Sequence, residues 1–378
     1  MRLIRHPPIL VFLALSPAPA ILFGINGPWY GGGTGPYLRP AFSFPQRLTP
    51  ETFRRASLWF NDRLGMRYPL IVIDSHWRLL VWRLRFRSDV LFGHGSWLFF
   101  NDNPLLSAAR LADVRGALRM NAADVATIDR QMSSARERFK ACRKGAFVVV
   151  APNKQSIYPE ELRKSGTYLT SRLDDVLARL GPQARSMFID PRAELRAAKP
   201  RHDVPVYHST DSHWNDLGAF IAYQKIVDVL AKANLIDRPE LATLEGVEIH
   251  AEASAGGDVA TRLLYLPWNF PDQHIALRGG ANVPLSLHTE RDRVIVNNPQ
   301  GRGKLLILAD SFGAPLASLL ARHFEEVEML SRPTWPALFD GEVIAARNPD
   351  VVMIEIAERS VPELLQPPAN LDRMCRAQ

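Results

Sequence analysis

The sequence predicts an α/β fold in which helices flank a central, mostly parallel sheet. Three short, mainly apolar runs indicate buried strands, namely Ala146–Ala151 (AFVVVA), Leu305–Ala309 (LLILA) and Val351–Ile356 (VVMIEI). Helical patterns lie between these runs, such as Ala122–Arg143, whose apolar residues fall on one face, and Ala314–His323. Alternation of strands and helices is typical of parallel sheets, whose chemistry gathers where the strands end.

The bulk composition is that of an ordinary globular protein. The chain has 378 residues, of which 47% are hydrophobic and 22% charged, enough for one large α/β domain or two smaller ones. Its formal net charge of +7 is spread along the chain, with neither a long basic block nor a nucleic-acid-binding motif. We therefore expect no nucleic-acid partner. The diffuse charge would suit an anionic polymer or membrane face, or serve solubility alone.

The N-terminus has the layout of an export signal. Arg2 and Arg5 precede the uncharged, apolar segment Ile9–Ile25. Within it, Ala18-Pro19-Ala20 has the form of a cleavage site, whereas about 17 apolar residues reach the lower limit for crossing a bilayer. Residues 1–25 are thus predicted to be a signal peptide or an N-terminal membrane anchor, and the remainder would lie in the periplasm.

The rest of the chain divides by composition into a linker and a domain. Residues 26–44 are rich in Gly, Pro and aromatic residues without periodicity, which predicts a linker. Residues 45–378 form the predicted domain. Its least regular part, Pro239–Gly303, is expected to carry short strands and loops that form one wall of a substrate cleft.

A serine follows one predicted strand directly. Asp310-Ser311-Phe312-Gly313 comes after the run Leu305–Ala309 and before a predicted helix. Ser311 would therefore sit at a strand's carboxyl end and near a helix N-terminus, two places where open α/β sheets position chemistry. A serine that only caps the helix is the alternative.

A possible partner for this serine lies earlier in the chain. Thr210–Phe220 reads TDSHWNDLGAF and places Asp211 two residues before His213. In an extended segment residues i and i+2 point the same way, so the carboxylate can orient the imidazole as the base of a serine nucleophile. Asp74-Ser75-His76-Trp77 spells the same DSHW but lacks the following Asn and the helix, so it is the weaker candidate.

The segments TDSHWND-GAF and ILADSF together resemble the alginate O-acetyltransferase family (the AlgJ/AlgX type), a branch of the SGNH-hydrolase superfamily. The resemblance extends over about residues 45–360. It implies an SGNH-hydrolase-like fold in which the Asp-x-His precedes the serine, a permuted order of the triad. It also implies Ser311 as nucleophile, His213 as base and Asp211 as its orienting acid. Ala309 stands where the family usually has glycine.

Three further residues are candidates for substrate binding. Asn153 and Lys154 follow the predicted strand Ala146–Ala151, again at the carboxyl edge of the sheet. In SGNH folds an asparagine helps to complete the oxyanion hole, so Asn153 could have that role or could only cap a turn. Lys154 could hold substrate. Trp214, within the DSHW segment, is grouped with them.

The resemblance implies a periplasmic O-acetyltransferase that acts through an acetyl-enzyme on Ser311. Its acceptor would be a hydroxyl of an exported polysaccharide, alginate-like or cellulose-like. A membrane-bound O-acyltransferase would supply the acetyl group, and the N-terminus would anchor the protein in the inner membrane. Two alternatives remain: a periplasmic esterase or deacetylase, in which water attacks the acetyl-enzyme, and a non-catalytic polysaccharide-binding component of an export complex.

No cofactor or metal is expected. The sequence contains neither a Walker loop nor a Rossmann glycine fingerprint. Its two cysteines, Cys142 and Cys375, lack metal-ligand spacing, which argues against a zinc site. An oxidising periplasm would allow a disulfide between them, but the sequence leaves their pairing open.

Overall fold

The computed structural model describes residues 52, 54, 67–82, 90–100, 119–162, 170–280, 283–290, 292–331 and 337–375. The predicted export segment at 1–25 and the linker at 26–44 lie outside these ranges. The chain divides into two compact units, one made of Met1–Arg87 with Thr261–Leu266 and the other of Ser88–Ala260 with Pro267–Gln378. The first unit contains the helix α4 (Arg67–Trp82). Across the described ranges, none of the helices is both long and apolar enough to cross a bilayer.

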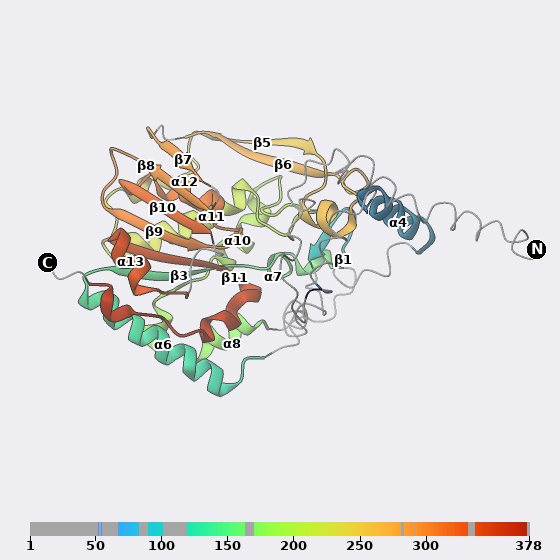
Figure 1. Ribbon diagram of the computed structural model, residues 1–378. Coiled ribbons are helices and arrows are strands. Elements are labelled where there is room, and N and C mark those ends of the chain that lie inside the picture. Colours follow the sequence, from blue (N-terminus) through green and yellow to red (C-terminus); the bar gives the residue numbers. More distant parts are fainter. Residues whose placement is uncertain are drawn as a thin grey trace, which may run out of the picture. The chain divides into compact units, whose positions relative to one another are not determined.

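The second unit is built on a mixed sheet. Within the described residues this sheet has seven strands in the order β4-β3-β11-β9-β10-β8-β7 (Figure 1). The strands are β3 (Gly145–Ala151), β4 (Phe188–Ile189), β7 (Ser286–Thr289), β8 (Arg293–Asn297), β9 (Lys304–Ala309), β10 (Glu326–Ser331) and β11 (Val351–Ala357). The strands from β4 to β10 pair in parallel, and β8 and β7 extend the sheet by antiparallel pairing. The predicted α/β fold with a mostly parallel central sheet is confirmed.

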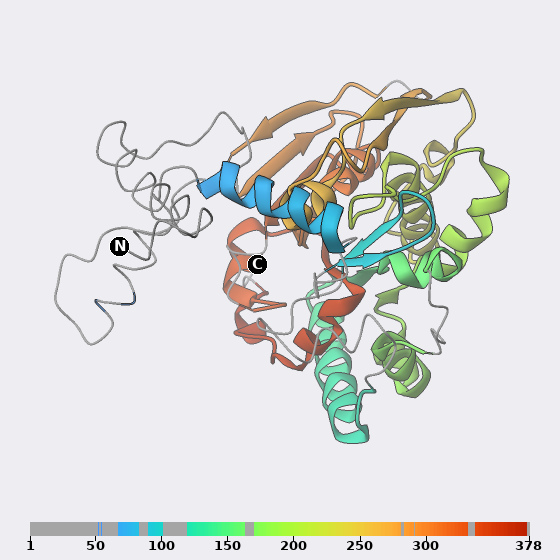
Figure 2. The ribbon, with the colours of Figure 1, turned by 90° about the vertical axis from the view of Figure 1, so that its right-hand side faces the viewer.

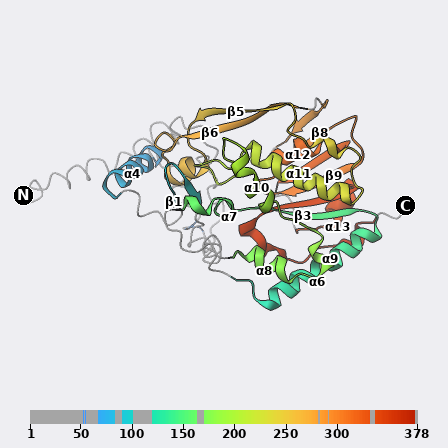
Figure 3. The same ribbon diagram turned by 180° about the vertical axis from the view of Figure 1, so that it is seen from behind.

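Helices cover both faces of the sheet, which explains why its central strands are apolar on both sides. In β9, Leu305 and Ile307 face one hydrophobic core, and Leu306 and Leu308 face the other. The first core includes α10 (Arg192–Ala198), α11 (Asp216–Lys232) and α12 (Ala314–Leu320), and the second includes α6 (Ala122–Ala141), α8 (Arg172–Arg179) and α13 (Gly341–Arg347). Figure 3 shows α10 and α11 from behind, with α6 and α8 on the opposite side of the sheet.

The helices α6, α8 and α11 start at side chains that accept hydrogen bonds from their free backbone amides. Asn121 accepts from the Asp124 amide at the start of α6, and Asn215 accepts from the Gly218 amide at the start of α11. Ser171 and Asp174 form a capping box on α8. The shorter elements are α7 (Lys154–Ile157), α9 (Pro182–Arg185), 3-10 helices at Pro159–Glu161, Lys199–Arg201, Pro239–Leu241, Glu358–Leu365 and Leu371–Arg373, and a π-helix at Val259–Leu264.

Among the described residues, two hairpins lie outside the main sheet. One pairs β1 (Val90–Phe92) with β2 (Leu98–Phe100), and the other pairs β5 (Val247–Ser254) with β6 (Asp272–Gly279) over eight residues each. In the view of Figure 2 the second hairpin lies at the top of this unit and α6 at the bottom. The short strands predicted between Pro239 and Gly303 are present as β7 and β8, whereas β5 and β6 are longer, with eight residues each, and Ile275 of β6 is buried in the core.

The two cysteines are joined. Cys142 and Cys375 form a disulfide with their Cα atoms 5.4 Å apart. Cys142 ends α6 and Cys375 follows the last 3-10 helix, so the bond fixes the end of the described chain to the helix before β3. The pairing that the sequence left open is present in the structure.

Candidate active site

Ser311 lies in the turn between β9 and α12, at the carboxyl edge of the sheet, and is exposed. The Asp310 carboxylate fixes this turn. Its Oδ1 accepts a hydrogen bond from the Phe312 amide (2.9 Å), and its Oδ2 accepts one from the Ala357 amide at the end of β11 (2.8 Å). Gly313 rather than Ser311 occupies the cap position of α12, so the helix-capping alternative for Ser311 is wrong.

Ala309 fits into the turn because Gly313 has no side chain. Ala309 is fully buried, and a Cβ placed on Gly313 would lie only 2.3 Å from the Ala309 Cβ. The absence of a side chain at Gly313 therefore provides the space that the Ala309 methyl group occupies. The close-packed turn is kept although glycine does not precede Asp310.

A buried acid lies beneath this turn. Glu355 pairs with Ala309 across β11 and β9 and is fully buried, and neither carboxyl oxygen receives a hydrogen bond from the described residues. Burial, together with the neighbouring Asp310 carboxylate, raises the pKa of Glu355 well above its ordinary value. The raised pKa favours the protonated form of Glu355, whose proton can be donated to Asp310.

The predicted Asp-x-His pair meets the serine. His213 Nε2 lies 2.7 Å from Ser311 Oγ, and His213 Nδ1 lies 2.6 Å from Asp211 Oδ1. Because a carboxylate only accepts hydrogen bonds, the proton belongs on Nδ1, which leaves Nε2 to accept from the serine hydroxyl. Burial alone would raise the pKa of Asp211, but the hydrogen bond and charge of His213 lower it below its ordinary value. Asp211 is therefore ionised wherever the imidazole can act as a base.

Asp211 is held by the segment that contains Asp258. The Asp258 amide donates to Asp211 Oδ2 (2.6 Å), and a Cβ on Gly257 would lie 2.3 Å from the Asp211 Cβ. The Asp258 carboxylate in turn accepts from the Ser212 amide (2.7 Å) and hydroxyl (2.6 Å). Burial and the nearby Asp211 charge raise the pKa of Asp258. Glycine at 257 is required here because the two backbones approach too closely for a side chain.

These supporting residues carry roles that the motifs did not assign. Asp258 follows a glycine pair in an otherwise irregular region, and Glu355 is an acid inside an apolar strand. A carboxyl group in a fully buried strand is a detectable signal, since it needs a partner. The sequence could have marked Glu355 in that way, but not its proximity to Asp310.

Two of the predicted substrate-binding residues have other roles in the structure. The Trp214 side chain is buried, its Nε1 donates to the Phe312 carbonyl (3.2 Å), and its ring packs edge-on against Phe312 at 5.2 Å. Lys154 is also buried, and its ammonium donates to the backbone carbonyls of His208, Ser209 and Asp211. Both residues organise the loop that contains Asp211 and His213, and neither offers a free polar group to a substrate.

Asn153 remains at the carboxyl edge, where the sequence placed it. It is buried, and its backbone amide donates to Glu358 Oε2 (2.9 Å). Its side chain makes no capping hydrogen bond to α7, so the turn-capping alternative receives no support. Among the described residues, the side-chain amide of Asn153 is not used in a hydrogen bond, so it can donate one to a substrate.

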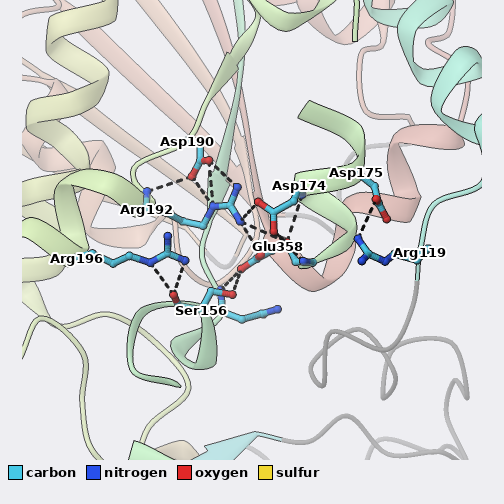
Figure 4. A network of polar contacts seen from close by, with 10 residues as sticks. Arg119, Ser156, Asp174, Asp175, Asp190, Arg192, Arg196 and Glu358 are labelled. Carbon is cyan, nitrogen blue, oxygen red and sulfur yellow. Dashed lines mark hydrogen bonds and ion pairs between the residues drawn. The ribbon is translucent and has the colours of Figure 1, made fainter. Parts of the chain in front are cut away.

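An ionic network holds this part of the edge in place (Figure 4). Glu358, which follows β11, accepts from the Ser156 hydroxyl (2.6 Å) as well as from Asn153. Arg192 contacts Glu358 (3.4 Å) and also pairs with Asp174 (2.8 Å) and Asp190 (2.8 Å). The buried charge of Glu358 is therefore compensated, and α7 is fixed to the end of β11.

Three ligand-type side chains gather near the imidazole. Asp211, His213 and Asp258 each offer an atom within 4.8 Å of the others, a spacing that could hold a metal ion. However, His213 Nδ1 is bonded to Asp211, and both Asp258 oxygens accept from Ser212. A metal ion would have to displace these bonds, so the cluster fits an Asp-His pair better than a metal site.

Comparisons with known proteins agree with this architecture. A family model for the SGNH hydrolase-like domain of the acetyltransferase AlgX matches residues 90–272. Among solved structures, PatB1 from Bacillus cereus has a TM-score of 0.54 at 14% identity and covers 72% of this chain and 96% of its own. A comparison with curated proteins finds no match.

Two structures that bear the names of the AlgJ/AlgX type give lower scores. The O-acetyltransferase domain of AlgJ from Pseudomonas putida has a TM-score of 0.44 at 18% identity, covering 73% of this chain and 93% of its own. AlgX from Pseudomonas aeruginosa has a TM-score of 0.45 at 15% identity, covering 78% and 70%. The family model thus relates residues 90–272, just under half of this chain, to the SGNH hydrolase-like domain of the acetyltransferase AlgX, and the similarity to the PatB1 structure supports the α/β fold.

Proposed function

We propose that this protein is a serine-dependent O-acetyltransferase that acts on hydroxyl groups of an exported polysaccharide. The observation that carries the proposal is the continuous chain of contacts from Asp211 through His213 to Ser311, at 2.6 and 2.7 Å. The family match ends at residue 272, before Ser311, so the role of this serine rests on the geometry. The family's acetyltransferase activity supports acetyl as the transferred group.

The proposed reaction has two stages. In the first, His213 removes the Ser311 proton as Oγ attacks the acetyl carbonyl; the donor leaves with that proton, and an acetyl ester remains on the serine. In the second, His213 removes a proton from a sugar hydroxyl, whose oxygen attacks the ester. The acetyl group moves to the sugar, and Ser311 regains its proton. Asp211 stabilises the imidazolium in both stages.

Negative charge on the carbonyl oxygen needs hydrogen-bond donors. Neither the Ser311 amide nor the side-chain amide of Asn153 is used in a hydrogen bond among the described residues. We assign these two groups to the oxyanion hole, in line with their places at the ends of β9 and β3.

A second candidate is an esterase that uses the same residues. Ser311 is exposed, so water can reach an acetyl-enzyme as readily as a sugar can. The two activities differ only in the acceptor of the acetyl group, water or a sugar hydroxyl. Only an assay that contains candidate sugars can distinguish them.

The setting of the reaction is also a proposal. The sequence supports export and an inner-membrane anchor, because Arg2 and Arg5 precede the apolar segment Ile9–Ile25. A periplasmic enzyme has no access to acetyl-CoA. We therefore assign the donor step to a membrane-bound O-acyltransferase partner and propose an alginate-like or cellulose-like polymer as acceptor.

The test compares the full-length protein with its Ser311→Ala variant. Each is mixed with a chromogenic acetyl ester and a panel of unacetylated oligosaccharides, and acetylated sugars are sought by mass spectrometry. Acetylated product that depends on Ser311 is expected and would begin to identify the polymer. Ester hydrolysis without sugar product would favour the esterase. Equal behaviour of the two proteins would overturn both and leave the binding role.

A further inference from the structure

The base loop, residues 208–214, has little regular structure of its own. Its ends approach each other through an isolated bridge between Tyr207 and Trp214, and no strand or helix lies between them in this described part of the chain. Its backbone carbonyls must therefore find partners elsewhere. The position of Asp211 and His213 opposite Ser311 depends on these partners.

Lys154 supplies three of these partners, beside the amide of Leu98, which donates to Ser209, and the amides of Val259 and Ala260, which donate to Thr210. Its Nζ donates to the carbonyls of His208 (3.0 Å), Ser209 (2.9 Å) and Asp211 (2.7 Å). An ammonium has three N–H donors, so all three are used on this loop. The side chain comes from α7, at the end of β3, and thus connects the base loop to the sheet.

The surroundings of the ammonium are nearly free of water. Lys154 is 2% exposed, and its Nζ lies 5.0 Å from the centre of the Phe99 ring and 5.4 Å from that of Trp97. The carboxylates that face it are those of Asp272, Asp258 and Asp211. Asp272 itself accepts hydrogen bonds from the amides and hydroxyls of Ser209 and Thr210. A cation and an anion therefore hold the first half of the loop from two sides.

The base of Lys154 is fixed as well. Glu358 binds the Asn153 amide and the Ser156 hydroxyl on either side of it, and Arg192 compensates the charge of Glu358. The contacts run without interruption from the end of β11 through Glu358 and α7 to the base loop. Hydrogen bonds thus hold the residues on either side of Lys154 as well as its ammonium group.

We propose that Lys154 is a positioning residue whose charged ammonium holds Asp211 and His213 opposite Ser311. The inference rests on the proposed function and deepens it, because it adds a requirement for activity that does not touch substrate. A neutral amine has only two N–H donors for three carbonyls, so its deprotonation would release one of them.

The proposal makes activity depend on pH in a defined direction. Burial lowers the pKa of Lys154 to about 8, an effect that Asp272, Asp258 and Asp211 partly oppose. Activity is therefore expected to fall above about pH 8. In the unfolded chain the same amine keeps its proton up to its ordinary pKa of 10.5. Between about pH 8 and that value the unfolded state therefore binds more protons than the folded state, and the contribution of Lys154 to the free energy of unfolding rises with pH. Loss of activity with rising stability distinguishes loop release from unfolding.

The experiment measures hydrolysis of a chromogenic acetyl ester by the full-length protein and three variants. Lys154→Met should lower kcat by about 100-fold while KM changes by less than about threefold, because the catalytic groups are displaced but the substrate contacts are kept. Lys154→Arg keeps the charge, so it should recover at least part of kcat and move the alkaline fall in rate to higher pH. Lys199→Met is the matched control, since Lys199 also binds a carbonyl (Ile157, 2.8 Å) and lies over an aromatic ring (Tyr158, 4.5 Å); its rate should be unchanged.

A measurement on the unaltered protein covers the case in which the variants fail to fold. Hydrogen exchange at pH 7 and pH 9.5, corrected for intrinsic rates, should show lost protection in residues 208–214 while β9 and β11 stay protected. Normal kcat in Lys154→Met, an effect confined to KM, or unchanged protection of the loop would each overturn the inference. Ester hydrolysis that survives Ser311→Ala would instead overturn the proposed function, so the two failures are separable.

Discussion

The chain contains the tetrapeptide Asp-Ser-His-Trp twice, and the two copies have different structures. In Asp74–Trp77 it lies inside α4, where Asp74 pairs with Arg78 (2.6 Å) and His76 Nδ1 lies 2.9 Å from the Val72 carbonyl. In Asp211–Trp214 it lies in the base loop, where the carboxylate and the imidazole face each other. Identical residues thus make contacts within one helix in one place and a proton-transfer pair in the other.

The backbone causes this difference. On a helix, residues i and i+2 point to nearly opposite sides, so Asp74 and His76 each find a partner four residues away. In the base loop, residues 211–213 form a bend, in which the His213 amide donates to Asp211 Oδ1 (3.0 Å), the oxygen that also faces His213 Nδ1. The residue after the tetrapeptide marks which backbone forms, since Asn215 stops the loop by capping α11, whereas Arg78 continues α4. A short motif therefore gains its chemical meaning from its boundaries.

The strongest test of this comparison exchanges the two histidines in turn for alanine. His213→Ala should lower kcat for ester hydrolysis by about 10³-fold or more, since the base is lost, and Asp211→Ala should have an effect of similar kind. His76→Ala and Asp74→Ala are the matched controls and should change the rate by less than about twofold. A large loss of rate in His76→Ala or Asp74→Ala would contradict the assignment of the catalytic base to His213.

The next largest effect is expected at the turn that contains Ser311, which lies opposite His213. Glu355→Ala should lower kcat by about tenfold, because Asp310 loses its buried neighbour and the Ser311 turn loosens. Glu355→Gln retains a donor and should keep activity within about threefold. The pKa of Glu355 is raised in the folded state, so above the ordinary pKa of a glutamate the folded state keeps a proton that the unfolded state has released. The contribution of Glu355 to the free energy of unfolding therefore falls as pH rises above that ordinary pKa. Denaturant unfolding at pH 5 and pH 8 should show that this dependence is reduced in Glu355→Gln; an unchanged dependence would count against a neutral Glu355.

A smaller effect concerns the residue after each tetrapeptide. Asn215→Ala removes the cap on α11 and the hydrogen bond to the Pro205 carbonyl (2.6 Å), so it should lower the free energy of unfolding by about 1–2 kcal/mol. Arg78→Ala removes an exposed pair and should leave stability unchanged within error. Chemical denaturation of both variants measures the difference, and equal effects would mean that the cap does not define the loop.

The smallest effect is expected from metal removal. Asp211, His213 and Asp258 use their ligand atoms in hydrogen bonds, so treatment with a chelator should not change the rate of ester hydrolysis. An excess of Zn²⁺ should inhibit, because the ion would compete for His213. A loss of activity on chelation that zinc restores would reverse this interpretation of the cluster.

The sequence predicted the elements whose pattern is local. The strands β3, β9 and β11 are predictable from runs of apolar residues. The pairing of Asp211 with His213 was predicted from their spacing, but residues 211–213 form a bend with the His213 amide on Asp211 Oδ1 and not the extended segment that the prediction assumed. The sequence also placed Lys154 and Trp214 near the site, but their roles depend on the direction of each side chain. Lys154 turns toward carbonyls more than 50 residues away, and no spacing in the chain contains that information.

The exchange of space between Ala309 and Gly313 has a consequence for finding similar enzymes. A search pattern that demands glycine before Asp-Ser would reject this chain, although its turn is as compact as such a pattern intends. The turn has room for one methyl group only, and this group can stand at position 309 or at position 313. The reversed pair, Ala309→Gly with Gly313→Ala, should accordingly preserve the turn, whereas Gly313→Ala by itself should disrupt it.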